Sequence, residues 1–367
     1  MAYSLPTKRR SDLEFSPSEL TGALGDSVTV LPLLVALAAT TSVSLPHALV
    51  GFGVFQIVWG LYYGVPLSVE PMKALIGLAI VGSLSYPELA AAGLLAGGVL
   101  LAVGHLGWIG RIQRVVGEPV IRGIQFAVAL LLLEAAVDLS LASPTVAAAG
   151  VAVVGLLALA GYARSSVLVV FALGGVAAVA TAGVPTPRVP TLALFPAGTP
   201  TLSAAAIEGT VAQLGMTIGN AAIATALLCG DLYDRDVSAD ALSTSMGVTC
   251  LAAVPAGGIP MCHGSGGLAG KYAFGARTAG ANVLLGLGYL ALALVATGAL
   301  LAAFPTAVLG VLLVVVALEL GRAAFAPVSG GPALAFVVGV GAVGLLVNVG
   351  VAFALGAVGY WLWARDA

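Results

Sequence analysis

Charged residues are scarce in this sequence of 367 residues. Asp, Glu, Lys and Arg make up 8% of it, whereas a soluble domain carries about 25%. So few charges cannot cover a surface that faces water. The formal net charge of −2 also provides no basic face for a nucleic acid. These absences exclude a soluble globular protein and predict that nucleic acid is not a partner.

Cysteine is rare as well. Cys229, Cys250 and Cys262 lie in or at the ends of apolar segments, a placement that predicts no disulfide framework. A cleavable signal peptide is not expected, because polar residues rather than an apolar stretch follow the basic residues near the N-terminus. We expect residues 1–19 to form a cytoplasmic tail.

Hydrophobic residues, in contrast, make up 60% of the chain, and its mean hydropathy is +1.10. Apolar runs of about 20 residues recur, the length that crosses a bilayer. We therefore predict an all-α polytopic membrane protein with about 14 transmembrane segments. These are expected at 20–40, 46–64, 70–84, 88–107, 117–138, 143–161, 166–183, 205–229, 239–256, 264–279, 281–303, 305–320, 332–347 and 349–363.

The chain divides into two halves of seven predicted segments, 20–183 and 205–367, joined by a Pro-rich linker at 184–204. Because seven is odd, the second half must start from the opposite side of the membrane, which makes the halves inverted repeats. Pairs at one offset of 194 residues support the repeat: Gly25 with Gly219, Gly53 with Gly247 and Pro66 with Pro260.

Basic residues predict the orientation. In this scheme Arg188, in the linker, falls on one side, and most other basic residues fall on the opposite side. The positive-inside rule assigns that second side to the cytoplasm. Both termini are then cytoplasmic and the linker is extracytoplasmic. The cytoplasmic set is Lys8, Arg9, Arg10, Arg111, Arg114, Arg164, Arg235, Arg277, Arg322 and Arg365.

The third and tenth segments are short, and an X-Pro dipeptide precedes each, at Pro66 and Pro260. X-Pro favours extended backbone, so each segment is expected to be a short extended stretch followed by a half-helix. Free N–H groups at the start of a helix bind anions, and we predict that the two half-helix N-termini converge on one. The candidate substrate-binding residues are Ser68, Val69, Glu70, Pro71, Met72, Cys262, His263, Gly264, Ser265 and Gly266.

The stretch GGIPMCHGSGGLAGK, at 257–271, also suggests other functions. Gly264–Ala269 fits a dinucleotide-binding pattern but lacks the strand–turn–helix unit around it, and Tyr272 breaks the match to a phosphate-binding loop. Cys262 and His263 have no further metal ligands nearby. As neighbours in extended backbone they point to opposite faces, so they do not form a nucleophile–base pair. Close helix packing at the glycines is an alternative that can coexist with a site.

Ionisable residues inside a membrane are costly and usually functional. Asp26 aligns with Asn220 in the repeat, and both are candidates for a coupling or cavity role or for a buried structural hydrogen bond. Glu70 and Lys73 are expected to pair on one helix face, and both are further coupling candidates. Lys271 is expected to anchor the end of its half-helix in the cytoplasm.

Four stretches resemble signatures of the molybdate transporter family, a branch related to the sulfate-permease superfamily. They are ELTGALGDSVTVLPLLVAL (19–37), GVPLSVEPMKAL (64–75), QLGMTIGNAAIATALL (213–228) and GGIPMCHGSGGLAGKYAFGAR (257–277). The resemblance implies a seven-plus-seven inverted-repeat fold, with a core domain of segments 1–4 and 8–11 and a gate domain of segments 5–7 and 12–14. It also implies an oxyanion substrate, with molybdate the leading candidate, and is compatible with a homodimer.

One residue departs from the family pattern, since Glu70 stands where the resemblance leads us to expect Gln. A carboxylate beside an anion site repels the ligand unless it is protonated or paired. Pairing with Lys73, protonation that couples uptake to protons, or a changed substrate would each resolve the conflict.

The sequence therefore predicts a secondary active transporter of a tetrahedral oxyanion in the cytoplasmic membrane. Molybdate leads over sulfate and tungstate, protons are the expected coupling ion, and alternating access is the expected mechanism. We expect no enzymatic activity, no cofactor and no metal site. The alternatives are a carrier of the same fold for a nucleobase, a carboxylate or bicarbonate, and a passive anion channel.

Overall fold

The computed structural model describes residues 13–191 and 193–366, and it is mostly helical. The predicted cytoplasmic tail, with Lys8, Arg9 and Arg10, falls largely outside the described residues. The first half contains α1 (Pro17–Thr40), α2 (Leu45–Tyr63), β1 (Val69–Pro71), α3 (Lys73–Ile80), α4 (Tyr86–His105), α5 (Ile109–Val116), α6 (Glu118–Leu141), α7 (Pro144–Leu159) and α8 (Ala163–Ala182). The second contains α9 (Ala204–Met216), η1 (Thr217–Ala224), α10 (Thr225–Tyr233), α11 (Ala239–Ala253), β2 (Met261–His263), α12 (Ser265–Ala273), α13 (Gly280–Val295), α14 (Gly298–Ala303), α15 (Thr306–Phe325), α16 (Gly331–Leu346) and α17 (Val349–Asp366).

Polar caps and prolines mark where the long helices begin. Ser16 accepts a hydrogen bond from the N–H of Glu19, and Pro17 occupies the first turn of α1. Ser85 and Glu88 form a capping box at the start of α4. Such residues satisfy N–H groups that have no partner within the helix. The helix boundaries consequently fall close to those expected from the sequence.

Three features differ from the predicted segments. Helix α5, Ile109–Val116, was not predicted, because its sequence IGRIQRVV is amphipathic rather than apolar. The eighth segment includes a turn of π-helix, η1. The eleventh is divided into α13 and α14, where Thr297 caps the new helix.

Among the described residues, seven helices are long and apolar enough to span a membrane, judged by length and composition, and four further apolar helices are shorter. The protein is a multi-pass membrane protein. The count of 14 segments, the two termini and their side of the membrane stay predictions.

The helices pack in pairs that follow the internal repeat. Helix α2 packs against α13, and α4 packs against α11. In the same way α1 contacts α12, and α9 contacts α3. Each of these contacts thus has a counterpart with the halves exchanged, as expected for two inverted repeats that pack around one another.

Two repeat-related glycines allow close approaches between these helices. A Cβ atom on Gly53 of α2 would lie 2.8 Å from the carbonyl oxygen of Gly286 on α13. A Cβ atom on Gly247 of α11 would lie 2.8 Å from the carbonyl oxygen of Gly97 on α4. Small residues at helix interfaces bring backbones together in membranes, so glycine packing operates here alongside the site described below.

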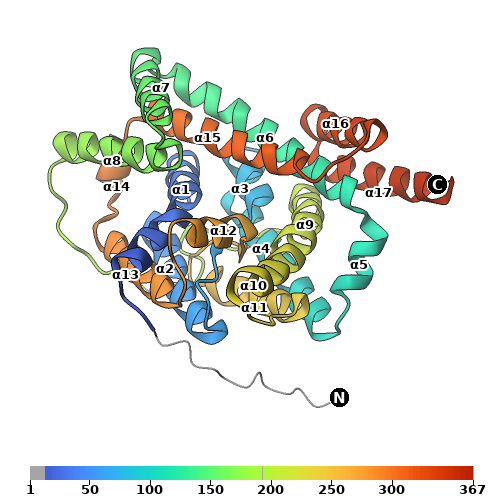
Figure 1. The fold of residues 1–367 in the computed structure, drawn as a ribbon. Helices are drawn as coiled ribbons and strands as arrows, with labels where there is room; N and C mark the ends of the chain where they lie inside the picture. Colours follow the sequence, from blue (N-terminus) through green and yellow to red (C-terminus); the bar gives the residue numbers. More distant parts are fainter. Residues whose placement is uncertain (1–12, 192, 367) are drawn as a thin grey trace.

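Figure 1 shows the spatial arrangement of the elements. Helices α6 and α15 lie side by side, with α7 and α8 at one end and α16 and α17 at the other. Helices α2, α4, α9, α10, α11 and α13 lie below the α6–α15 pair in the view of Figure 1, near α3 and α12. The division into a core and a gate domain, with its bounds, stays a prediction.

Candidate functional site

The two predicted extended stretches pair with each other. Strands β1 and β2 are antiparallel, with Val69 opposite His263, Glu70 opposite Cys262 and Pro71 opposite Met261. Beyond the ladder, the N–H of Met72 donates to the carbonyl of Pro260 at 3.0 Å. Each strand runs directly into its half-helix, so the starts of α3 and α12 are held beside one another. The prediction of extended stretches followed by half-helices is confirmed.

Four charged side chains lie close together beside the paired strands. The ammonium of Lys73 pairs with the carboxylate of Glu70. The hydroxyl of Ser68 donates to Asp26 at 2.6 Å and lies 3.4 Å from Glu70. Lys271 then pairs with Asp26 at 3.2 Å. We call Asp26, Glu70, Lys73 and Lys271 the charge cluster; its two carboxylates lie between its two ammonium groups, with the hydroxyl of Ser68 between the carboxylates.

The pairing of Glu70 with Lys73 was predicted, but the prediction placed both residues on one helix. Glu70 lies on β1 and only Lys73 lies on α3, so the two residues do not share a helix face. Glu70 is buried, whereas the side chain of Lys73 is 21% exposed. Lys73 is therefore the member of the pair that a ligand can reach.

The predicted role of Lys271 as a cytoplasmic anchor is wrong. Its side chain is fully buried, and besides Asp26 its ammonium donates to Gln56 at 3.0 Å and Asn282 at 2.7 Å. The carbonyl of Leu67 lies 3.5 Å away. Helical side chains point toward the N-terminus of their helix, so a long lysine on the second turn of α12 reaches back into the protein. Four oxygen atoms surround this ammonium.

The N-terminus of α3 is occupied by a glutamine that the sequence did not single out. The side-chain oxygen of Gln213, on α9, accepts from the N–H of Ala74 at 2.9 Å and of Leu75 at 3.4 Å. The amide group of Gln213 donates in turn to Thr217 at 2.9 Å. The expectation that both half-helices offer free N–H groups is therefore wrong for most of the first turn of α3.

The N-terminus of α12 is partly occupied by Glu70. The N–H of Gly267 donates to a carboxylate oxygen of Glu70 at 2.8 Å. The amides of Ser265 and Gly266 have no acceptor among the described residues, and Gly266 is exposed. A Cβ atom on Gly266 would meet nothing within 4 Å. The open side of this helix start thus lies at Ser265 and Gly266.

Gly264 and Gly267 face the opposite, filled side. A Cβ atom on Gly264 would collide with the Glu70 carboxylate, and one on Gly267 would collide with Ser68, Asp26 and Glu70. Both positions therefore require glycine because the charge cluster lies against the backbone.

Cys262 and His263 contribute walls of the site. His263 is buried, and its ring contacts the hydroxyl of Ser245 at 2.7 Å and the carbonyl of Ser68 at 3.3 Å. The side chain of Cys262 is partly exposed and lies 3.9 Å from the carbonyl of Pro71. No group of three or more potential metal ligands occurs in the described part of the chain.

The side chains of Val69 and Met72 are buried in the hydrophobic core, and Ser68 is bonded to Asp26. These three side chains are therefore occupied within the protein, and a contribution of residues 68–72 to ligand binding through the backbone stays a prediction. Ser68 positions the carboxylate of Asp26.

Asn220 lies on η1 and faces α6 instead of the charge cluster. It accepts from Arg122 at 2.8 Å and donates to Gln125 at 3.0 Å. Gln125 donates to the carbonyl of Leu320 on α15 at 3.2 Å. π-Helical turns often occur at functional positions, and this one connects the half-helix region with α6 and α15.

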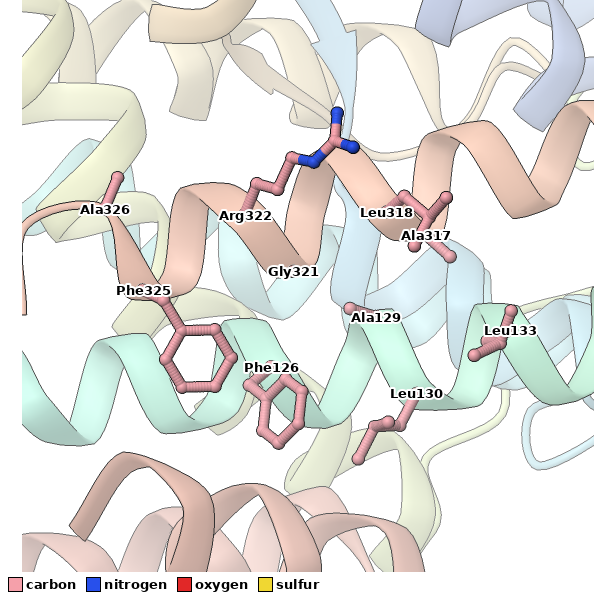
Figure 2. A pocket seen from close by; sticks show the side chains of 10 residues that line it. All are labelled: Phe126, Ala129, Leu130, Leu133, Ala317, Leu318, Gly321, Arg322, Phe325 and Ala326. Carbon is pink, nitrogen blue, oxygen red and sulfur yellow. The ribbon is translucent and has the colours of Figure 1, made fainter. Parts of the chain in front are cut away.

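A groove of about 480 Å³ lies between α6 and α15. Figure 2 shows the side chains that line it. It is mainly apolar, with Phe126, Leu130, Leu133 and Phe325 among its lining residues. Arg322 points away from the two phenyl rings. None of the lining residues belongs to the charge cluster or to the two strands.

Comparison with known proteins agrees with this arrangement. The family model described as "Molybdate transporter of MFS superfamily" matches residues 18–132 and 205–320. Molybdate transporter 1 of Arabidopsis thaliana is 30% identical over 369 residues, covering 84% of this chain and 79% of that protein. Molybdate transporter 1 of Chlamydomonas reinhardtii is 28% identical, with 83% of each protein covered.

Solved structures share the fold at low sequence identity. The transmembrane domain of the cyanobacterial bicarbonate transporter BicA aligns with a TM-score of 0.67 and 16% identity, covering 93% of this chain and 97% of that one. The anion transporter Slc26a9 from mouse, in its inward-facing state, aligns with a TM-score of 0.71 and 14% identity, covering 99% and 70%.

The matched residues include both half-helices and both helices, α1 and α9, that hold polar partners for them. The predicted inverted-repeat fold is confirmed, and the relatives are transporters rather than enzymes. The chain belongs to the molybdate transporter family.

Proposed function

We propose that this protein carries a tetrahedral oxyanion, with molybdate the leading candidate, across the cytoplasmic membrane by proton-coupled alternating access. The relatives named as molybdate transporters support the choice of ion. Sulfate and tungstate are the closest competitors, because they are tetrahedral dianions too.

One observation carries the proposal. The amides of Ser265 and Gly266 at the start of α12 have no acceptor among the described residues, and a Cβ atom on Gly266 would meet nothing within 4 Å. The partly exposed side chain of Lys73 lies on the neighbouring half-helix. Backbone N–H groups and the positive end of a helix stabilise an anion without many cationic side chains. A lysine acts there as an additional point charge.

Alternating access would move this site as one body. The strands, the two half-helices and the charge cluster are tied together by buried hydrogen bonds. The α6–α15 pair packs outside them. In carriers with inverted repeats, one group of helices rocks against the other around a site near the middle of the membrane.

Uptake into proteoliposomes tests the proposal. With purified protein and an inward proton gradient, we expect saturable accumulation of radiolabelled molybdate that tungstate and sulfate inhibit and uracil does not. Protein-free liposomes are the control. Inhibition by uracil or bicarbonate alone would contradict an oxyanion carrier. Equilibration without accumulation, unaffected by a protonophore, would indicate a channel.

A further inference from the structure

We propose that the carboxylate of Glu70 is a built-in anion that fills part of the substrate site in the empty carrier and leaves it, as the neutral acid, when an oxyanion enters. This inference rests on the proposed function and deepens it. It concerns a residue at which the resemblance leads us to expect glutamine.

The contacts of Glu70 are those expected of a bound oxyanion. One carboxylate oxygen accepts the N–H of Gly267 at the start of α12, at 2.8 Å. The other pairs with the ammonium of Lys73 on α3. A helix-start amide and an ammonium are the two kinds of donor that the site offers to its substrate. Glu70 and the substrate therefore compete for the same groups.

Two glycines without side chains leave space for this carboxylate. Gly264 and Gly267 flank it, and a side chain at either position would collide with it. On the other side of the same helix turn, Gly266 faces open space. An anion that enters beside Gly266 thus approaches the carboxylate directly, and the two negative charges repel each other in a poorly screened environment.

The surrounding charges are balanced while the site is empty. Facing Glu70 are Asp26 of α1 through Ser68, Lys73 of α3, Lys271 of α12, and Cys262 and His263 of β2. A dianion would add two negative charges to a cluster of two carboxylates and two ammonium groups. Protonation of Glu70 removes one negative charge. It also weakens the hold of Glu70 on Lys73 and Gly267, whose donors then become available to the oxyanion.

The sign of the pH dependence follows. A lower pH favours the neutral acid, so oxyanion binding to the wild-type protein should strengthen as pH falls. Sulfate stays a dianion near neutral pH. A change of its binding affinity with pH must therefore come from a group of the protein that gains or loses a proton.

Binding to the variant Glu70→Gln tests the proposal. The amide side chain has a similar shape but carries no charge, so it competes less well for a charge-assisted hydrogen bond. By calorimetry on the purified full-length protein at neutral pH, we expect molybdate and sulfate to bind about tenfold more tightly than to wild type. We also expect the affinity of the variant to be independent of pH.

Glu134→Gln is the matched control, since Glu134 is an exposed carboxylate on α6, and it should retain the affinity and pH dependence of wild type. Weaker binding to Glu70→Gln at every pH would overturn the proposal, because Glu70 would then hold the substrate. An unchanged affinity with an unchanged pH dependence would overturn it as well. If wild type and both variants bind none of molybdate, tungstate and sulfate, the proposed function itself fails.

Proton uptake by the wild-type protein provides a test that needs no substitution. Calorimetric titration with sulfate in buffers of different ionisation enthalpy measures the protons taken up per anion bound. We expect net uptake that approaches one proton per sulfate above the pH at which Glu70 ionises. Anion binding without proton uptake at any pH would contradict the proposal and leave oxyanion transport intact.

Discussion

At the scale of single residues, the site depends on charges that are paired before any substrate arrives. Lys271 and Asp26 are both fully buried, and both bond to the side-chain amide of Gln56. Asp26 also accepts a hydrogen bond from the hydroxyl of Ser68. Removing one partner of such a pair leaves an uncompensated charge, which costs far more than the pair contributes. The half-helix sequences therefore constrain residues on α1 and α2 as well.

Replacing Lys271 by methionine should lower the free energy of unfolding by about 3–5 kcal/mol, because the Asp26 carboxylate loses its counter-charge in a buried site. A fall in Tm of the purified protein measures the effect. The double variant Lys271→Met, Asp26→Asn, which removes both charges, should recover much of the loss. A double variant that is less stable than Lys271→Met alone would contradict the pairing.

At the scale of secondary structure, each half-helix begins with a different kind of cap. A neutral glutamine on α9 caps α3, whereas a carboxylate from β1 bonds to the first turn of α12. Only the second arrangement can change its charge. The two repeat-related half-helices thus have different chemistry despite similar backbones, and we expect α12 to respond to the substrate more than α3.

Gly267→Ala tests the tight fit at the start of α12. The added Cβ atom would collide with Ser68, Asp26 and Glu70, so the half-helix must shift away from the charge cluster. We expect loss of oxyanion uptake by at least about tenfold in proteoliposomes, since a small displacement of a binding group is costly. Gly98→Ala on α4 is the control, because its Cβ atom would meet nothing within 4 Å. Equal uptake by the two variants would argue against this fit.

Much of this element-level arrangement could be predicted from the sequence, but the side-chain partners could not. Pro66 and Pro260 marked the extended stretches, and hydropathy located the helices to within a few residues. The burial of Lys271 was missed. Hydropathy indicates the position of this residue along α12, but it does not show that α1, α2 and α13 place oxygen atoms around its ammonium group. Gln213 was missed for the same reason: its acceptor role depends on how α9 packs against α3.

At the scale of the whole molecule, hydrogen bonds from Asn220 link η1, beside the half-helices, to α6 outside them. Arg122 and Gln125 of α6 bond to Asn220 of η1, and Arg122 also pairs with Glu118 at 3.1 Å. If the two groups of helices move against each other, this contact must break and form again. The contact then contributes to the free-energy difference between the two conformations that this movement connects.

Asn220→Ala should shift that equilibrium. The loss of a hydrogen bond to a charged group is worth about 1.5 kcal/mol, which corresponds to roughly a tenfold change in population. Cys262 is partly exposed beside the site, while Cys229 and Cys250 are buried, so its alkylation rate reports access. We expect faster alkylation in the variant than in wild type. An unchanged rate, with folding intact by size-exclusion chromatography, would show that the contact does not control access.

The four oxygen atoms around the ammonium of Lys271 have a thermodynamic consequence. A carboxylate, two side-chain carbonyls and a backbone carbonyl are the ligands that would also suit a small monovalent cation. Here the cation is attached to the chain by covalent bonds, so its local concentration is fixed by geometry and not by the medium. Mass action cannot remove it, unlike a free ion whose stabilising effect depends on its concentration. The positive charge of Lys271, next to the proposed substrate site, is therefore the same whichever side of the membrane the site faces and whatever salt that side contains.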